Sequence, residues 1–229
     1  MSVLMHHPYE ETLLAYAAGT LDEPTSILVA THLALCPECR SVVQAAEAIG
    51  GELMEALRPM EAVTTTVDDL FQLMTAEKIS TDATKVRSEI RRDPAANSNT
   101  ADTVLPLPLR TYIPGGVDSL KWQWMGPGVR YARILDDGAG TKAGLMRIAS
   151  GTRMPQHGHS DEEFTMVLAG SYSDSFGNYR RGDVETATTE TLHQPVADND
   201  GDCLCLVVTR GALKPTSLIA RVLQPLMRM

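Results

Sequence analysis

The spacing of apolar residues changes once along the chain, and this change limits the folds open to it. In residues 8–79 apolar side chains recur at helical spacing, whereas from about residue 105 they form short β-type runs between Gly and Pro. Several short strands about ten residues apart are typical of an antiparallel sandwich or barrel. We therefore expect an α+β protein with a helical N-terminal part and an all-β C-terminal part.

The helical part predicts four helices, because each candidate has its own start or stop signals. Proline and acidic residues stand at the starts, and Gly19 ends the first helix. The four sequences are PYEETLLAYAAGTL, DEPTSILVATHLALC, PECRSVVQAAEAIGGELMEALRPM and TTTVDDLFQLMTAEK. Residues 80–104 are polar and rich in Ser, Thr, Asn and Asp, which indicates a linker. The expected organisation is a four-helix domain over residues 1–79, this linker, and a β domain over residues 105–229.

The net charge of −9 lies entirely in the helical part. Residues 1–79 hold 12 Asp and Glu against 3 Lys and Arg, and the rest of the chain is balanced. Phosphates would repel so acidic a segment, so we expect no direct binding to nucleic acid. A basic protein surface would suit it as a partner, although an acidic face kept for solubility explains the charge equally well.

The sequence shows no membrane or export signal. No apolar run approaches the ~18 residues that span a bilayer. The start, MSVLMHHPYEE, lacks the basic region and long apolar core of a secretion signal. Four cysteines among 229 residues do not make a disulfide scaffold. We therefore expect a cytoplasmic protein without membrane association.

A histidine motif in the β part predicts a metal site. The stretch GTRMPQHGHSDEEFTMVLAG has the spacing Gly151-x5-His157-x-His159-x3-Glu163-x6-Gly170. Residues i and i+2 of a strand face the same way, so His157 and His159 would both point into a barrel. Glu163 starts the next strand, and a later strand over GDVETATTETLHQP would add His193. Three imidazoles and a carboxylate suit a transition metal; histidines in a metal-free core are the alternative.

A second motif, ATHLALCPECRS, lies in the helical part. Cys36-x2-Cys39 with His32 upstream supplies three ligands of a tetrahedral zinc site, with His32 and Cys36 one helical turn apart. Only His6 and His7 remain in this part to supply the fourth, and either would close a His2Cys2 shell. The alternatives are buried cysteines without metal, or a redox thiol pair, for which the βαβ context is missing.

Both motifs resemble known families. The spacing around His157 is similar to the first cupin motif in every position. The second cupin motif keeps its register from Gly182 to His193, but its usual Pro, Gly and Asn are replaced by Thr188, Glu190 and Ala197. The H-x3-C-x2-C pattern in an acidic helical segment resembles the zinc-binding anti-sigma domain. Its combination with a cupin resembles the ChrR-type anti-sigma factors over nearly the whole chain.

This resemblance implies a jelly-roll cupin barrel after the helical domain, and a set of ligands for each metal. For the helical site it implies zinc held by His7, His32, Cys36 and Cys39, with His6 as the fallback for His7. For the cupin site it implies zinc, with iron, manganese and nickel as alternatives, held by His157, His159, Glu163 and His193. A closed His2Cys2 shell has no open position, so we expect the first zinc to be structural.

The resemblance also implies a function. Such proteins restrain an extracytoplasmic-function sigma factor and release it in the response to singlet oxygen, with a small molecule or an oxidant as the signal at the cupin. The fourth predicted helix carries an apolar stripe suited to packing on that partner, made of Val67, Leu70, Phe71 and Met74. No residue is assigned a catalytic role. The alternative is a cupin metalloenzyme for dioxygenase or hydroperoxide chemistry, with a zinc-stapled regulatory domain.

Overall fold

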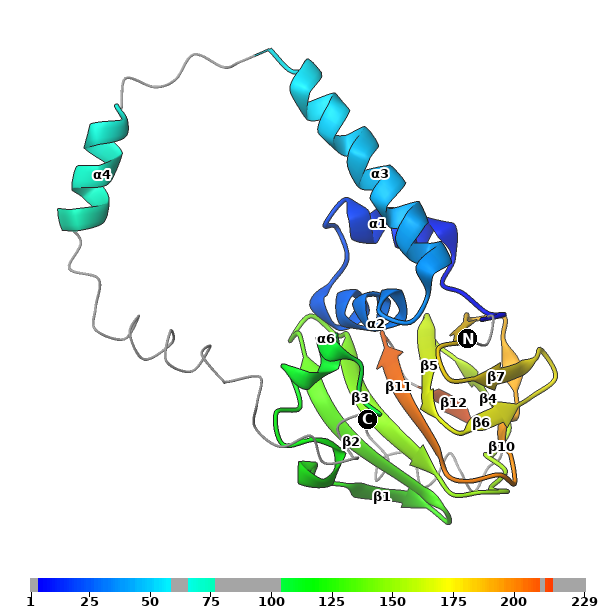
Figure 1. The fold of residues 1–229 in the computed structure, drawn as a ribbon. Coiled ribbons are helices and arrows are strands. Elements are labelled where there is room, and N and C mark those ends of the chain that lie inside the picture. The colour runs from blue at the N-terminus through cyan, green and yellow to red at the C-terminus, as the bar shows by residue number, and fades with distance from the viewer. Residues whose placement is uncertain (1–3, 59–65, 77–103, 211–212, 216–229) are drawn as a thin grey trace.

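The computed structural model describes residues 4–58, 66–76, 104–210 and 213–215 (Figure 1). Helices precede strands, which confirms the α+β class. The helices are α1 (Glu10–Ala17), α2 (Glu23–Leu33), α3 (Pro37–Ala56), α4 (Val67–Ala76), α6 (Leu107–Arg110) and the 3-10 helix η2 (Val117–Ser119). The strands are β1 (Gln123–Gly126), β2 (Val129–Asp136), β3 (Lys142–Ile148), β4 (His157–His159), β5 (Glu163–Ala169), β6 (Ser171–Ser173), β7 (Asn178–Arg180), β8 (Val184–Ala187), β9 (Leu192–His193), β10 (Val196–Ala197), β11 (Cys203–Thr209) and β12 (Leu213–Pro215). Residues 80–103 of the predicted linker lie outside the described ranges.

The helix count differs from the prediction. The described ranges contain five α-helices, since α6 follows the linker where a β domain was expected to begin. Pro106 stands at its N-cap and Pro108 in its first turn, where proline favours a helix start. Leu105 and Leu109 are fully buried and fix α6 in the same core as α2. In Figure 1, α4 stands apart from α1, α2 and α3.

Local signals set the ends of the N-terminal helices. The carboxylate of Asp22 accepts the Thr25 N–H at 2.8 Å and so caps α2. Gly19 has φ 68° and ends α1, in the left-handed conformation that glycine adopts without strain. Cys36 is the N-cap of α3, and its sulfur accepts the Cys39 N–H at 3.4 Å.

The strands form an antiparallel β-sandwich. The main sheet has the order β1-β2-β3-β11-β5-β8, and two three-stranded sheets have the orders β10-β6-β7 and β12-β4-β9. Strand β11 lies between β3 and β5, and all seven of its residues are buried. The runs predicted around residues 129–135, 143–149, 164–170 and 202–208 correspond to β2, β3, β5 and β11. The prediction of an antiparallel β domain is confirmed, except that the short helices α6 and η2 precede its first strand.

Helix α2 is apolar on two faces and joins the helical part to the sheet. Ile27 and Leu28 belong to the core cluster of the main sheet. Val29 and Leu33 belong to a separate cluster with α1 and α3. At the other end of this junction, Arg210, which directly follows β11, pairs with Asp22 at 2.7 Å.

The segment before α1 also attaches to the sheet. The carboxylate of Asp183 accepts the N–H groups of Met5 and His6, at 2.8 and 3.1 Å. The N–H of Val184 donates to the His6 carbonyl at 3.0 Å. The chain start is thereby laid along β8, which places His7 beside α2 and α3. Within the described ranges, no helix has the length and apolar character needed to cross a membrane.

Candidate metal centres

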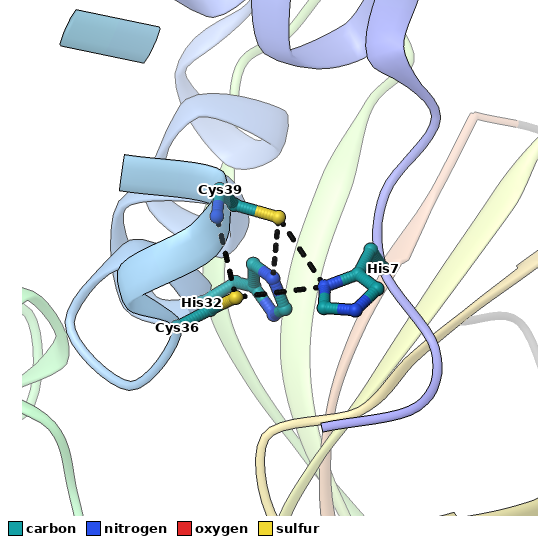
Figure 2. Close-up of side chains that lie close together, drawn as sticks. All are labelled: His7, His32, Cys36 and Cys39. Carbon is teal, nitrogen blue, oxygen red and sulfur yellow. Dashed lines mark hydrogen bonds between the residues drawn. The ribbon is translucent and has the colours of Figure 1, made fainter. Parts of the chain in front are cut away.

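The first candidate centre, called here the helical centre, is built from His7, His32, Cys36 and Cys39 (Figure 2). The Nδ1 atom of His7 lies 3.5 Å from the sulfur of Cys36 and 3.3 Å from that of Cys39. The Nε2 atom of His32 lies 3.3 Å from the sulfur of Cys39. Nitrogen and sulfur ligands of one tetrahedral zinc ion are about 3.6 Å apart, so the four atoms fit such an ion.

The protons around the helical centre support this fit. His32 Nδ1 lies 2.8 Å from the Gly182 carbonyl, which can only accept, so Nδ1 carries the proton and Nε2 presents its lone pair to Cys39. Burial lowers the pKa of His32 to about 4, which keeps the ring neutral. Burial and the adjacent Cys36 raise the pKa of Cys39 to about 12 in the absence of a cation. A metal ion would displace that proton, and the N-terminus of α3 favours the resulting thiolates.

His6 has a different environment from His7. Its ring lies against Tyr179, with centroids 4.5 Å apart, and its backbone bonds Asp183 and Val184. The structure therefore places His7 with the two cysteines and His6 on the β-sandwich.

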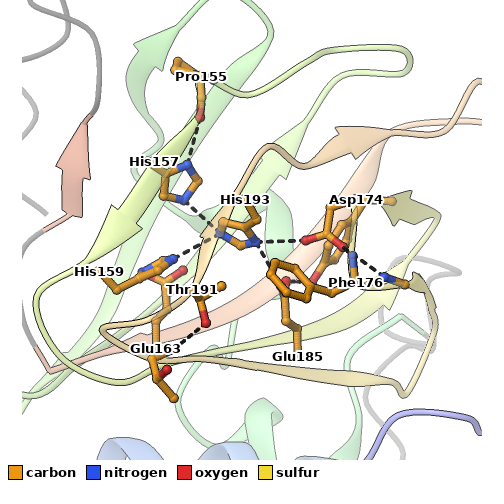
Figure 3. A network of polar contacts seen from close by, with 12 residues as sticks. Pro155, His157, His159, Glu163, Asp174, Phe176, Glu185, Thr191 and His193 are labelled. Carbon is orange, nitrogen blue, oxygen red and sulfur yellow. Dashed lines mark hydrogen bonds and ion pairs between the residues drawn. The ribbon is translucent and has the colours of Figure 1, made fainter.

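The second candidate centre, called here the cupin centre, brings together His157, His159 and His193 (Figure 3). All three are buried, and His157 pairs directly with His193 across β4 and β9. The Nε2 atom of His193 lies 3.2 Å from that of His157 and 3.1 Å from that of His159. Imidazole ligands of one metal ion are about 3.0–3.4 Å apart, so this spacing fits a shared ion.

Hydrogen bonds on the far sides of the rings set their tautomers. His157 Nδ1 donates to the Pro155 carbonyl at 2.8 Å, and His193 Nδ1 faces both Asp174 and Glu185 at 2.9 Å. Each Nδ1 therefore holds a proton, and in the neutral rings the Nε2 lone pairs face each other, an arrangement that a cation between them would stabilise. Burial and the neighbouring rings lower the pKa of His159 to about 3. Burial also opposes charge on His193, but the bonds to Glu185 and Asp174 outweigh it and raise its pKa.

Glu163 is not in the group of three converging nitrogens. Its Oε2 lies 3.7 Å from His159 Nδ1, and this buried atom has no hydrogen-bond partner among the described residues. Burial, together with the charge of Glu185, raises the pKa of Glu163 to about 7 although His193 opposes the shift. A buried carboxylate oxygen without a hydrogen-bond partner, beside three imidazoles, fits a centre that a cation completes.

A cavity of about 40 Å³ adjoins the cupin centre, enough for on the order of three water-sized ligands. His157, Glu163 and His193 line one side. The remaining wall is largely apolar and rich in sulfur, with Met146, Ile148, Met154, Cys205 and Val207 among its residues. A ligand could thus approach this metal, whereas the helical centre already has four protein ligands.

Comparison with known proteins agrees with both centres. A family model of the ChrR cupin-like domain matches residues 114–213, and one of a putative zinc-finger matches residues 8–40. The anti-sigma-E factor ChrR of Cereibacter sphaeroides is 36% identical over 225 residues, which cover 98% of this chain and 99% of that protein. The chain belongs to the ChrR family of anti-sigma factors.

A solved structure extends this likeness to three dimensions. It is the crystal structure of Rhodobacter sphaeroides SigE in complex with the anti-sigma ChrR. The match has 35% identity and a TM-score of 0.70, and it covers 90% of this chain and 99% of that chain. ChrR is named as an anti-sigma factor, that is, a regulator, which favours the regulatory prediction over the metalloenzyme alternative. The zinc-finger match and the His/Cys cluster together support zinc in the helical centre.

The predicted partner stripe on α4 is only partly described. The side chains of Val67 and Phe71 are 68% and 61% exposed. Those of Leu70 and Met74 lie outside the described part of the structure.

Sequence reasoning missed a larger apolar surface on this ChrR-family chain. The buried residues of α3 lie near the N-terminal end of the helix and are Cys39 and Val43. The rest of α3 projects beyond α1 and α2 (Figure 1). Exposed apolar side chains continue along it to its C-terminal end, at Ile49, Leu53, Met54 and Leu57, each more than 60% exposed. The sequence did contain a signal for this surface: apolar residues at helical spacing continue to the C-terminal end of this helix.

The structure also adds residues that hold the metal ligands in place. Asp174 and Glu185 both contact His193, and the Gly182 carbonyl contacts His32. Gly182 opens the second cupin motif, but that motif does not indicate a role for its carbonyl, and Asp174 and Glu185 occupy no motif position.

Proposed function

We propose that this chain is a zinc-dependent inhibitor of an extracytoplasmic-function sigma factor, and that it releases this factor in response to oxidative stress of the singlet-oxygen type. Helices α1, α2, α3 and α4, within residues 1–79, form the inhibitory domain. Residues 80–104 are its linker, and residues 105–229 form the cupin-like sensor. As a partner of the transcription machinery, the protein works in the cytoplasm and does not bind nucleic acid itself.

Zinc in the helical centre holds the inhibitory helices together. Their own core is small, with Leu13, Val29, Leu33 and Val43 as its main buried aliphatic side chains. A domain of this size buries too little apolar surface to be stable without a further constraint. Bound zinc would join the segment at His7 to both α2 and α3, and so hold the N-terminal end of α3 in place.

The exposed face of α3 carries the proposal. Ile49, Leu53 and Leu57 are four residues apart and thus lie along one side of the helix, with 63%, 65% and 71% of their surfaces exposed. On α4, Val67 and Phe71 repeat this spacing. Amphipathic helices of this kind bind a partner through such i, i+4 anchors. Acidic residues on the same helices, which contribute to the net charge of −9, complement the basic surfaces that a sigma factor uses on promoter DNA.

The cupin centre supplies the response. His157, His159, Glu163 and His193 would hold the metal, which we take to be zinc, with iron, manganese and nickel as alternatives. The apolar cavity beside it would admit a small oxidised molecule or the oxidant itself. A bound metal there would polarise such a ligand as a Lewis acid. Repression itself needs no turnover, because covering the sigma factor is sufficient.

Binding of the chain to its cognate sigma factor, followed by calorimetry, tests the proposal. Leu53→Asp places a charge at the centre of the α3 face, and we expect a loss of affinity of about tenfold or more. Leu107→Asp is the matched control, since Leu107 is 74% exposed but lies on α6 beside the sheet. The proposal is wrong if the unmodified chain forms no complex, or if both variants bind as tightly as it does.

A further inference from the structure

One stretch of chain, from Asp174 to Glu185, contacts both metal centres. At its C-terminal end, the Gly182 carbonyl accepts a hydrogen bond from His32 of the helical centre at 2.8 Å. Three residues later, Glu185 contacts His193 of the cupin centre at 2.9 Å. We call residues 174–185 the coupling segment.

The first link runs through the backbone and Asp183. Its Oδ1 accepts the N–H groups of Met5 and His6, next to His7, while its Oδ2 accepts the Arg180 N–H at 2.9 Å. Val184 then donates to the His6 carbonyl at 3.0 Å. The buried Asp183 carboxylate therefore fixes the segment that carries His7 to the turn that orients His32.

A second link runs through stacked rings. The His6 ring lies 4.5 Å from that of Tyr179, which stacks on Tyr172 at 4.8 Å between centroids. The Tyr172 hydroxyl donates to Glu185 at 2.6 Å, and Glu185 contacts His193. Asp174, at the start of the segment, contacts the same His193 nitrogen at 2.9 Å (Figure 3).

The main side chains of the two links on the β-sandwich are buried, whereas Met5, at the far end of the first link, is 73% exposed. The exposed fractions of Tyr172, Tyr179, Asp183 and Glu185 are 2%, 4%, 4% and 6%. Close-packed side chains cannot shift independently, so a displacement at one end of such a chain of contacts must be taken up by its neighbours.

We propose that the coupling segment links the two centres energetically, so that metal in the cupin centre slows the loss of zinc from the helical centre. This inference rests on the two metal sites of the proposed function. Metal in the cupin centre fixes His193, which orders Glu185 and Asp174 and, through Asp183 and Gly182, the positions of His7 and His32. Because coupling free energy is reciprocal, zinc in the helical centre strengthens metal binding in the cupin centre by the same equilibrium factor.

The consequence for regulation is direct. A ligand or oxidant that displaces metal from the cupin centre would weaken the zinc staple of the inhibitory helices without touching it. Zinc would then no longer hold the N-terminal end of α3, the helix that carries the sigma-binding face.

The test uses the full chain loaded with cobalt(II), which occupies zinc sites. Only the helical centre has thiolate ligands, so its thiolate-to-cobalt charge-transfer band reports that centre alone. Loss of the band after addition of a chelator gives the release rate. His157→Ala empties the cupin centre at a ligand whose outer nitrogen contacts Pro155, outside the coupling segment. Asp183→Asn disrupts the first link and leaves the ring link in place. Asp198→Asn is the matched control, since Asp198 is also an aspartate that accepts a hydrogen bond on the β-sandwich, from Ser171.

We expect His157→Ala to speed cobalt release from the helical centre by about fivefold or more, the lower end of typical coupling. In the Asp183→Asn background, the effect of His157→Ala should be clearly smaller, because only the ring link remains. Asp198→Asn should leave the full effect of His157→Ala. The inference is overturned if His157→Ala changes the rate less than about twofold although both centres of the parent chain are loaded, or if Asp198→Asn acts like Asp183→Asn.

A reciprocal measurement covers the case in which Asp183→Asn does not fold. Cys39→Ser removes the helical centre, and we expect release of cobalt from the cupin centre to speed up; an unchanged rate contradicts coupling. Failure of the proposed function is distinguishable from failure of coupling. A chain that binds both metals independently and still binds its sigma factor refutes only the coupling, whereas a coupled chain that binds no sigma factor refutes only the proposed function.

Discussion

Replacing Leu28 with alanine tests whether the helices and the β-sandwich unfold as one unit. Leu28 has no exposed surface and belongs to the core cluster of the main sheet, although it lies in the helical part of the chain. The next residue, Val29, is equally buried but packs with α1 and α3. A cavity at Leu28 therefore lies at the boundary between the two parts.

Its cost can be estimated from how far the site can close. Leu→Ala substitutions in cores cost about 2.7–5 kcal/mol, and the cost rises with the volume that stays empty. Helix α2 cannot move into the gap, because Val29 holds its other face and His32 is bonded to Gly182. We therefore expect a loss of about 4 kcal/mol. For a chain of this size each kcal/mol lowers the melting temperature by roughly 2–4 °C, so the expected shift is roughly 8–16 °C.

The assay is thermal unfolding of the zinc-loaded chain followed by two signals. Tryptophan fluorescence reports the β-sandwich, because Trp122 and Trp124 lie before and within β1, and far-ultraviolet circular dichroism reports the helices. Both transitions should move together in Leu28→Ala. Leu57→Ala, at a side chain that is 71% exposed, should change the stability by less than about 0.5 kcal/mol. If only the helical transition moves in Leu28→Ala, the two parts fold independently and this reasoning is wrong.

Substitutions at three further positions have defined outcomes. Asp22→Asn keeps a good helix cap but loses the charge pair with Arg210, so it should cost less than about 1 kcal/mol, and Asp22→Ala should cost about 1 kcal/mol more. Burial opposes ionisation of Asp22, but its hydrogen bonds with Thr25 and Arg210 outweigh this and lower its pKa. The stabilisation from the Asp22–Arg210 pair is therefore present at neutral pH and lost as the pH falls below the usual aspartate pKa of about 4. Urea unfolding at neutral pH and at a pH below about 4 measures this loss. Glu163→Gln should raise the melting temperature of the metal-free chain, because it removes a buried carboxylate whose Oε2 has no hydrogen-bond partner, and should lower that of the metal-loaded chain; the same sign in both states contradicts a ligand role. Phe71→Ala should weaken sigma binding about tenfold by calorimetry without changing the melting temperature, and unchanged binding would remove α4 from the interface.

Features determined by local spacing were predictable from the sequence. The long strands follow from alternating apolar residues, and His157 and His159 meet because a strand places i and i+2 on one face. Cys36 and Cys39 approach each other because Pro37 starts α3 directly after the first cysteine. The sequence also predicted that a histidine near the start of the chain joins Cys36 and Cys39, but it left His6 and His7 as alternatives.

Features created by pairing between distant segments were not predictable. The β6–β7 hairpin carries Asp174 to His193, which is nineteen positions later in the chain. The Gly182 carbonyl meets His32 across 150 positions, and a backbone carbonyl has no signature in a sequence. The two apolar faces of α2 were equally hidden, because helical spacing does not say which core each face joins.

The two centres differ in one property that assigns them different roles. The helical centre offers four protein ligands to a tetrahedral ion. An ion held in this way has no position for a signal and can only leave or stay. The cupin centre instead opens on a cavity, so its metal could exchange a ligand. A signal received there must still reach α3, which contacts the helical centre through Cys36 and Cys39. The contacts from His193 to Glu185, and from Asp183 two residues earlier to the segment of His7, offer one such route, beside the packing of α2, which carries His32, on the main sheet.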